Sequence, residues 1–511
     1  MDLLLALIPF VLIFLLLIVF RLPAVKAMPL VFLATLLLIT SYWKMTDEVL
    51  IASSFRAVLI FVELLLIILF AVLLINLYKE TGMIKKIESS LASISPDYRV
   101  QAMLIAWAFV ALIEGAAGFG TPVALAAPFL VMLGFPAVKA IIIGLIGDST
   151  AVTFGAAGTP IIVGMSSAGL SSEQISSVVI TSALIHLPLA IIATLSITYV
   201  ITRKEGFKEF IPFAVFSALA FTIPYTLTAI LLGPELPSII GGVVAILLIS
   251  LAGKYNFLTP HKVLTYKKNI SPVKITSLAK PLVPFLVMIA ALILTRNLEY
   301  LNSLLRKSEL GFNNLLNTGI SQVFQPFYTP SFYFLIAILI TIPLFKVNKK
   351  LFTHAFKESV NKIKYAMITL IFVLLTAQLI LYSNLNNSNL DGMTTILANG
   401  LSSALGSYYI YLSPLIGAMG TFVTGSSTVS NLLLASIQVD TAFTIGFSAV
   451  LLASLQTIGS AAGNMFAIHN VITATAVVGV KKGEGEIIKY NLVIACIYCL
   501  AAAVLGVLFF S

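Results

Sequence analysis

The chain carries few charged residues, and this shortage decides its class. Asp, Glu, Lys and Arg make up 10% of its 511 residues, whereas hydrophobic residues make up 59%. Soluble domains average about a quarter charged residues, so a soluble protein is excluded. Apolar runs near the roughly 20 residues needed to cross a bilayer recur along the whole chain. The sequence therefore predicts a polytopic, all-α integral membrane protein without a sizeable soluble domain.

Cysteine and metal-binding or catalytic motifs are also scarce. The two cysteines, Cys496 and Cys499, lie in the last apolar run, where a buried thiol behaves as a small hydrophobe. No His or Cys is spaced to complete a zinc site, and neither H-E-x-x-H nor a G-x-S-x-G elbow occurs. We expect no metal, no cofactor and no enzymatic activity. An intramembrane enzyme built on buried acid and base groups is the least favoured alternative.

The net charge of +10 comes from lysines and arginines in short loops, so it indicates membrane topology and not a nucleic-acid partner. The N-terminus lacks a basic n-region and a cleavage site, and residues 3–20 are interpreted as a retained first span. With the N-terminus outside, nearly all basic loops face the cytoplasm. These loops are 21–26, 79–99, 203–209, 254–280, 346–364 and 481–489. The loop 296–309 is the exception, because its basic and acidic residues nearly balance.

Twelve spans are predicted, together with two apolar stretches that turn back inside the membrane. The spans are 3–20, 28–43, 57–78, 137–163, 178–201, 210–232, 238–252, 281–295, 331–345, 365–383, 441–479 and 487–510. The stretches 101–135 and 408–438 are about 30 residues long with Gly, Ser or Thr clustered at the middle, which favours two half-length helices in a re-entrant hairpin. The spans 137–163 and 441–479 carry similar interruptions and are predicted to be broken helices.

The two halves of the chain show an internal repeat. Gly115, Gly120 and Gly158 correspond to Gly420, Gly425 and Gly463 at a constant offset of 305. Amphipathic segments at 82–94 and 391–405, too polar to span, are predicted to lie at the interface. An odd number of spans separates corresponding elements, so the halves run in opposite directions, as in many secondary transporters. The predicted units are a first repeat (1–205), an inserted helix pair with a basic loop (206–280) and a second repeat (281–511).

The hairpin tips and the helix interruptions should meet at the membrane midplane. They comprise 114–121, 420–428, 147–160 and 456–470. None contains Lys or Arg, but half-helix N-termini offer unpaired N–H groups and partial positive charge to an anion. Hydroxyl and amide side chains suit a small hydroxylated carboxylate. The substrate-binding candidates are Gly118, Gly120, Thr121, Ser149, Thr150, Ser426, Ser427, Thr428, Asn431, Gln456, Asn464 and His469; close helix packing is the alternative role for the hydroxyls.

Ionisable side chains inside a membrane are costly and therefore indicate function. The candidates for proton coupling are Glu114, Asp148 and His469. Alternatives remain open: Glu114 could bind backbone N–H groups at the hairpin tip, Asp148 could be an N-cap, and His469 could be a hydrogen-bonded core residue. Glu63 is interpreted as a structural or interface group. His186, just before a proline, is expected to bond a carbonyl freed by the kink.

The segment EGAAGFGTPVAL (114–125) closely resembles the corresponding segment of the L-lactate permease family, which also takes up glycolate. The resemblance extends to 134–161, 413–438 and 460–479. It implies proton-coupled symport of L-lactate or related 2-hydroxymonocarboxylates across the cytoplasmic membrane, an elevator-type motion and a possible homodimer.

The sequence also departs from the family pattern. Some members have an acid at Ser427, Asn at Asp148 and Lys at Asn464. This chain shows no fixed cation in these segments. Sodium-coupled uptake of a related carboxylate remains the alternative, with backbone carbonyls of the unwound segments as ligands of the ion.

Overall fold

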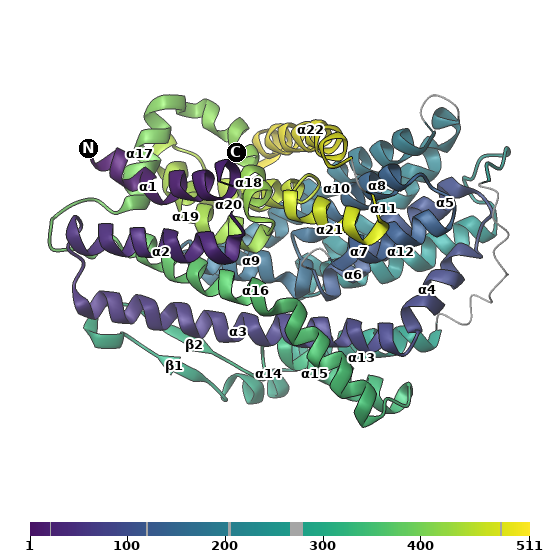
Figure 1. Ribbon diagram of the computed structural model, residues 1–511, viewed down its shortest axis with the longest axis horizontal. Coiled ribbons are helices and arrows are strands. Elements are labelled where there is room, and N and C mark those ends of the chain that lie inside the picture. Colours follow the sequence, from purple (N-terminus) through teal and green to yellow (C-terminus); the bar gives the residue numbers. More distant parts are fainter. Residues whose placement is uncertain (21, 119–120, 203–205, 266–278, 481–482, 511) are drawn as a thin grey trace.

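The computed structural model describes residues 1–20, 22–118, 121–202, 206–265, 279–480 and 483–510. Within these residues the chain is helical apart from two short strands and connecting loops (Figure 1). Nine helices in the described part are long and apolar enough to cross a membrane, or up to eleven if each bent pair is one span. The polytopic helical class is confirmed, whereas the count of twelve stays a prediction.

The elements of the first half follow the predicted order. They are α1 (Asp2–Phe14), the π-helix η1 (Leu15–Val19), α2 (Ala24–Ser41), α3 (Asp47–Glu80), α4 (Met83–Ala92), α5 (Tyr98–Ala102), the π-helix η2 (Met103–Phe109), α6 (Val110–Ala116), α7 (Thr121–Met132), α8 (Ala137–Val152), α9 (Gly155–Ser167), α10 (Ser172–Thr202), α11 (Phe207–Leu232) and α12 (Pro237–Lys254). We call α5–η2–α6 and α7 together hairpin 1.

The second half repeats the pattern of long helix, short helix, hairpin, broken helix and long helix. Its elements are α13 (Ala279–Asn297), α14 (Glu299–Arg306), β1 (Leu310–Phe312), η4 (Leu315–Asn317), β2 (Gln322–Phe324), α15 (Pro330–Leu344), α16 (Lys349–Leu381), α17 (Met393–Leu405), η5 (Gly406–Tyr408), α18 (Tyr409–Thr424), α19 (Ser427–Ile445), α20 (Ala449–Gly463), α21 (Ile468–Val478) and α22 (Glu484–Phe510). We call α18 and α19 hairpin 2.

The prediction of a purely α-helical chain is wrong at one place. In the loop between α14 and α15, β1 and β2 form an antiparallel pair in which Leu310 faces Phe324. The pair brings Phe312 against Phe55 of α3, with ring centroids 5.2 Å apart. This aromatic contact stabilises the two strands. With three residues each, they are too short to show the alternation of apolar and polar residues that predicts a strand.

Two long helices begin earlier than their apolar runs suggest. The predicted spans 57–78 and 365–383 belong to α3, which starts at Asp47, and α16, which starts at Lys349. Thr46 and Asn348 cap these helices, because their side-chain oxygens accept hydrogen bonds from backbone N–H groups of the first turn. The polar first turns are therefore helical, which hydropathy alone cannot show.

The boundary between hairpin 2 and the second broken helix is also corrected. Residues 441–445 belong to α19, which continues to Ile445 and ends at Gly446 in the left-handed conformation. Ser448 then caps α20 by accepting a hydrogen bond from the Leu451 N–H. The broken helix therefore runs from Ala449 to Val478, with its interruption at residues 464–467.

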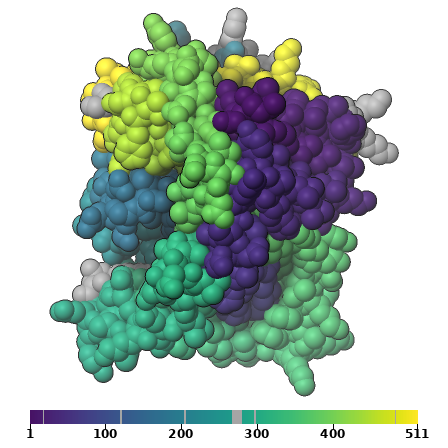
Figure 2. Space-filling model, turned by 90° about the vertical axis from the view of Figure 1, so that its left-hand side faces the viewer, coloured from purple at the N-terminus to yellow at the C-terminus, as the bar shows by residue number. Residues whose placement is uncertain are grey.

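The helices form an outer group and an inner group. α3 packs along α16, and α2 and α15 pack beside them. The inner group contains both hairpins, both broken helices, α10 and α22, and α12 packs against hairpin 1. In Figure 1 the N-terminus and α17 lie toward one end of the long axis, and α4 and α5 toward the other. Figure 2 views the first of these ends and shows α17 in green beside α1 in dark purple.

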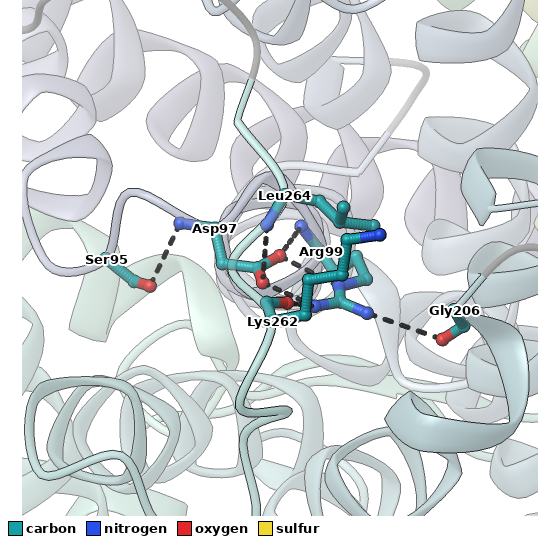
Figure 3. A network of polar contacts seen from close by, with 6 residues as sticks. All are labelled: Ser95, Asp97, Arg99, Gly206, Lys262 and Leu264. Atoms are coloured by element: carbon teal, nitrogen blue, oxygen red, sulfur yellow. Dashed lines mark hydrogen bonds and ion pairs between the residues drawn. The ribbon is translucent and has the colours of Figure 1, made fainter.

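A buried ion pair fastens the base of hairpin 1 to neighbouring loops (Figure 3). Arg99 and Asp97 are 0% and 3% exposed, and Arg99 Nη2 lies 2.6 Å from Asp97 Oδ2. Arg99 also donates to the carbonyls of Lys262 (2.6 Å) and Gly206 (3.4 Å), while the Leu264 N–H donates to Asp97. These loop residues flank α11 and α12, so the inserted pair is tied to hairpin 1. The predicted basic loop residues 266–278 lie outside the described residues.

Candidate functional site

A small cavity of about 30 Å³ lies where both hairpin tips and both helix interruptions meet. The four predicted polar segments therefore come together. Glycines, hydroxyls, one amide, one carboxyl and three apolar residues line it: Glu114, Gly118, Val152, Gly155, Ala156, Pro160, Gly425, Ser426, Ser427, Thr428 and Asn464. This volume has room for about two water molecules. The cavity must widen before it can hold a three-carbon acid.

Glycines in the left-handed conformation form the two hairpin tips. Gly118 has φ +56° and Gly425 has φ +73°, values that a side chain would make costly. Ser426 follows as the N-cap of α19, its hydroxyl accepting from the Val429 N–H at 3.4 Å. The hydroxyls of Ser427 and Ser460 lie 2.6 Å apart, which ties the start of α19 to α20. The N-terminus of α19 therefore points its first turn at the cavity.

The first broken helix bends by 54° between α8 and α9. Ala156, Ala157 and Gly158 all have positive φ, of 41°, 52° and 77°. A non-glycine residue in this region costs about 1–3 kcal/mol, and such strain gathers at functional sites. The strained turn places the start of α9 beside Glu114.

Two carboxyl groups, those of Glu114 and Asp148, are close enough to interact electrostatically, and Glu114 lines the cavity. They are 4% and 0% exposed. Glu114 Oε2 and Asp148 Oδ1 accept no hydrogen bond from any described residue. A Cβ on Gly155 would lie 2.1 Å from Glu114 Oε1, so only glycine lets the carboxyl sit there. Asp148 lies inside α8, so the N-cap alternative is wrong, and Glu114 binds no backbone N–H in the described part of the chain.

Asn464 joins this pair to the second half of the chain. Its Nδ2 donates to Asp148 Oδ2 at 2.6 Å, and its Oδ1 accepts from Asn470 Nδ2 at 2.5 Å. Asn464 also lines the cavity. The two interruptions, one from each half of the chain, are therefore connected through side chains.

Several predicted binding residues lie near the cavity without lining it. Asn431 and Gln456 belong to a buried amide network in which Asn431 Nδ2 donates to the Pro160 carbonyl at 3.0 Å. The Ser149 hydroxyl bonds within its own helix, to the Ile146 carbonyl. His469 is exposed and its Cβ packs against Gly425. None of these four lines the cavity, so their part in substrate binding stays a prediction. Gly120 lies outside the described residues.

Thr150 and His186 belong to a separate buried network behind the first interruption. His186 Nδ1 and Nε2 lie 2.8 Å from the hydroxyls of Tyr498 and Thr153, and the Tyr498 hydroxyl lies 2.9 Å from that of Thr150. Tyr225 donates to the Thr150 carbonyl. The expectation that His186 bonds a freed carbonyl is wrong, because both of its ring nitrogens are hydrogen-bonded to hydroxyls of other elements. The network joins α8, α10, α11 and α22.

Two basic residues that contact hairpin 1 or the first broken helix were not singled out from the sequence. Lys362 of α16 donates to the Thr121 hydroxyl, at 3.3 Å, at the start of α7. Arg56 of α3 donates to Gln378 and to the Ser166 carbonyl at the end of α9. Lys362 lies in the predicted loop 346–364, and Arg56 directly precedes the predicted span 57–78. Both lie inside long helices, α16 and α3, that begin earlier than the apolar runs do.

Comparisons with known proteins identify the family of this chain. The family profile described as L-lactate permease matches residues 2–510. The chain belongs to the L-lactate permease family. A protein of Haemophilus influenzae named putative L-lactate permease is 32% identical over 487 residues, covering 91% of this chain and 90% of that protein. An L-lactate permease of Bacillus subtilis is 28% identical and covers 92% and 89%, and a glycolate permease of Escherichia coli is 28% identical and covers 99% and 94%.

Membership of this family makes the chain a multi-pass transporter of the cell membrane and not an enzyme. It acts on lactate-like substrates, in keeping with the names of its relatives. Solved structures of the YdaH transporter of Alcanivorax borkumensis and of MtrF of Neisseria gonorrhoeae match 86% and 87% of the chain, and 84% and 80% of their own chains. Both are 15% identical, with TM-scores of 0.43 and 0.45, which is too distant to support an argument.

Proposed function

We propose that this permease is a symporter that carries one proton with each 2-hydroxymonocarboxylate, L-lactate or glycolate, into the cell. The observation that supports it best is the buried pair Glu114–Asp148 beside the cavity. No Lys or Arg forms an ion pair with either carboxyl among the described residues. Two charged carboxylates in contact would repel each other strongly in a buried site, so a shared proton stabilises the pair.

The same pair explains why a proton and an anion would travel together. A substrate carboxylate entering the cavity adds a negative charge beside Glu114, and a proton on the pair offsets it. The N-terminus of α19, with the hydroxyls of Ser426 and Thr428, supplies N–H and O–H donors for the anion. The proton and the anion together carry no net charge, so a complete transport cycle moves no net charge across the bilayer. We propose that the two re-entrant hairpins carry it by an elevator-type motion.

Uptake into proteoliposomes tests the coupling. Purified protein is reconstituted, and labelled L-lactate or glycolate is supplied with an acid exterior and a neutral interior. We expect accumulation above that of protein-free vesicles, abolished by a protonophore and unchanged by a clamped membrane potential. Uptake that requires sodium at fixed pH and ignores the proton gradient would instead establish the sodium-coupled alternative.

Amide variants test the role of the pair. Glu114→Gln and Asp148→Asn keep the size of each side chain but remove a titratable group. We expect at least one of them to retain exchange of labelled for unlabelled lactate while losing accumulation driven by the proton gradient. Glu173→Gln, at the start of α10 and far from the cavity lining, is the matched control and should behave as wild type. Normal accumulation by both amide variants would contradict the proposal.

A further inference from the structure

Lys362 reaches from the outer helix group to hairpin 1. On α16, the buried residues Ala355, Ser359, Ile363 and Met367 recur every fourth position. Ser359 accepts a hydrogen bond from Asn76 of α3, at 2.8 Å, which identifies the face that packs on α3. Lys362 lies at the edge of this face, seven positions after Ala355, and its side chain is exposed. Its ammonium lies 3.3 Å from the Thr121 hydroxyl, so the lysine connects α16 with hairpin 1.

The charge around this ammonium is unbalanced. A lysine has three N–H donors, and Lys362 makes one hydrogen bond to a neutral hydroxyl. No carboxylate lies within ion-pairing distance among the described residues, and Glu358 acts on it only from a longer range. Lys79 adds a second positive charge close by, and Thr121 begins α7, whose N-terminus is itself positive. Glu358, four positions earlier on α16, offsets part of this positive charge. The Lys362 side chain is exposed, so an anion can reach its ammonium.

The position of this charge relates it to the cavity. Gly118, which lines the cavity, accepts a hydrogen bond from the Thr121 N–H at 3.1 Å. Lys362 lies in the half of α16 nearer Lys349, the half that loop charges assign to the cytoplasmic side. An anion that leaves the cavity around the tip of hairpin 1 on that side meets this ammonium.

We propose that Lys362 and Thr121 form a second, transient site for the substrate carboxylate, at the cytoplasmic mouth of the transport path. The ammonium binds the carboxylate, and the Thr121 hydroxyl bonds the carboxylate or the neighbouring 2-hydroxyl. The proposal rests on the proposed function, because it takes the transported acid as the ligand. The substrate is then held in the main cavity during translocation. At the cytoplasmic face it passes Lys362 when it is released into the cell or binds again from the cytoplasm.

The test compares KM on the two sides of the membrane. Full-length protein is reconstituted in one orientation, and labelled L-lactate flux is measured from each face. For Lys362→Gln we expect KM at the cytoplasmic face to rise about tenfold or more, as is usual for losing a charged hydrogen bond. KM at the outer face should stay within about twofold. Lys362→Arg should keep most of the affinity, and Thr121→Val should raise KM at the cytoplasmic face by a few fold.

Lys364→Gln is the matched control, because its ammonium lies over the Tyr365 ring and not at hairpin 1. It should leave both KM values unchanged. An unchanged cytoplasmic KM in Lys362→Gln, or equal losses in Lys364→Gln, would overturn the inference while wild-type transport continues. If Lys362→Gln fails to fold, an unchanged cytoplasmic KM in Thr121→Val overturns it. Absence of flux of any 2-hydroxy acid by wild type would instead contradict the proposed function.

Discussion

At the scale of single residues, the site depends on how closely a backbone can approach a carboxyl group. Gly155 permits the contact between α9 and Glu114, since a methyl group there would overlap Glu114 Oε1. The carboxyl would have to move away from Asp148, and the buried pair would be broken. The position of the Glu114 carboxyl therefore depends on Gly155, although the two residues are 41 positions apart in the sequence.

Gly155→Ala is therefore expected to reduce proton-driven lactate uptake at least tenfold with the protein still folded, as judged by size-exclusion chromatography. The matched control is Gly485→Ala, where a Cβ would meet no atom within 4 Å. Wild-type uptake by Gly155→Ala would show that the position of the Glu114 carboxyl is unimportant for transport.

At the scale of elements, the interruption of the first broken helix is supported from behind by the network around His186. Tyr498 is central, because its hydroxyl contacts both His186 and Thr150. A Tyr498 O–H that donates to Nδ1 leaves Nε2–H to donate to Thr153, so one neutral tautomer satisfies the whole chain of hydrogen bonds. Four helices are thereby held in register beside the strained turn at Ala156.

Tyr498→Phe removes this hydroxyl and leaves His186 and Thr150 each short of a buried partner. We expect a loss of about 1–3 kcal/mol in stability, seen as a lower midpoint of thermal unfolding in detergent. Tyr408→Phe is the control, because Tyr408 is 78% exposed. Equal midpoints for the two variants would mean that the network contributes nothing to stability.

At the scale of the whole molecule, a buried charge pair reinforces the packing of α11 and α12 against hairpin 1 (Figure 3). Arg99→Met would leave Asp97 buried and unpaired, at a cost of about 3–5 kcal/mol. We expect poor expression and a lower unfolding midpoint. Asp97→Asn combined with Arg99→Met should recover part of that loss, since no unpaired charge remains, and the exposed Lys357→Met should have little effect. A double variant less stable than Arg99→Met would contradict this account.

The orientation of the molecule in the membrane is a prediction from loop charges that labelling can check. In a background with Cys496 and Cys499 replaced by alanine, Asn387→Cys should react with an impermeant maleimide in intact cells. Lys357→Cys should react only after permeabilisation; both positions are exposed in the structure. The reverse pattern would invert the topology and move the Lys362 site to the outer face. The predicted homodimer stays a prediction.

The sequence by itself determined the membrane class, the order of elements in both halves and the segments that interrupt them. Hydropathy and glycine spacing are local properties, and the hairpin tips at Gly118 and Gly425 follow from them directly. Helix ends were harder to predict. The helices capped by Thr46 and Asn348 begin with polar residues, which a hydropathy pattern assigns to loops.

Only the tertiary structure decided which side chains share the site. Glu114 is a neighbour of Asp148, Asp148 accepts from Asn464 of the other half of the chain, and the Thr150 hydroxyl bonds Tyr498. The direction of a buried side chain depends on the partner that satisfies its hydrogen bonds, and for Asp148 and Thr150 that partner lies more than 300 residues away. Lys362 was missed for the same reason: in the sequence it is one more loop lysine, and in the fold it lies at a hairpin tip.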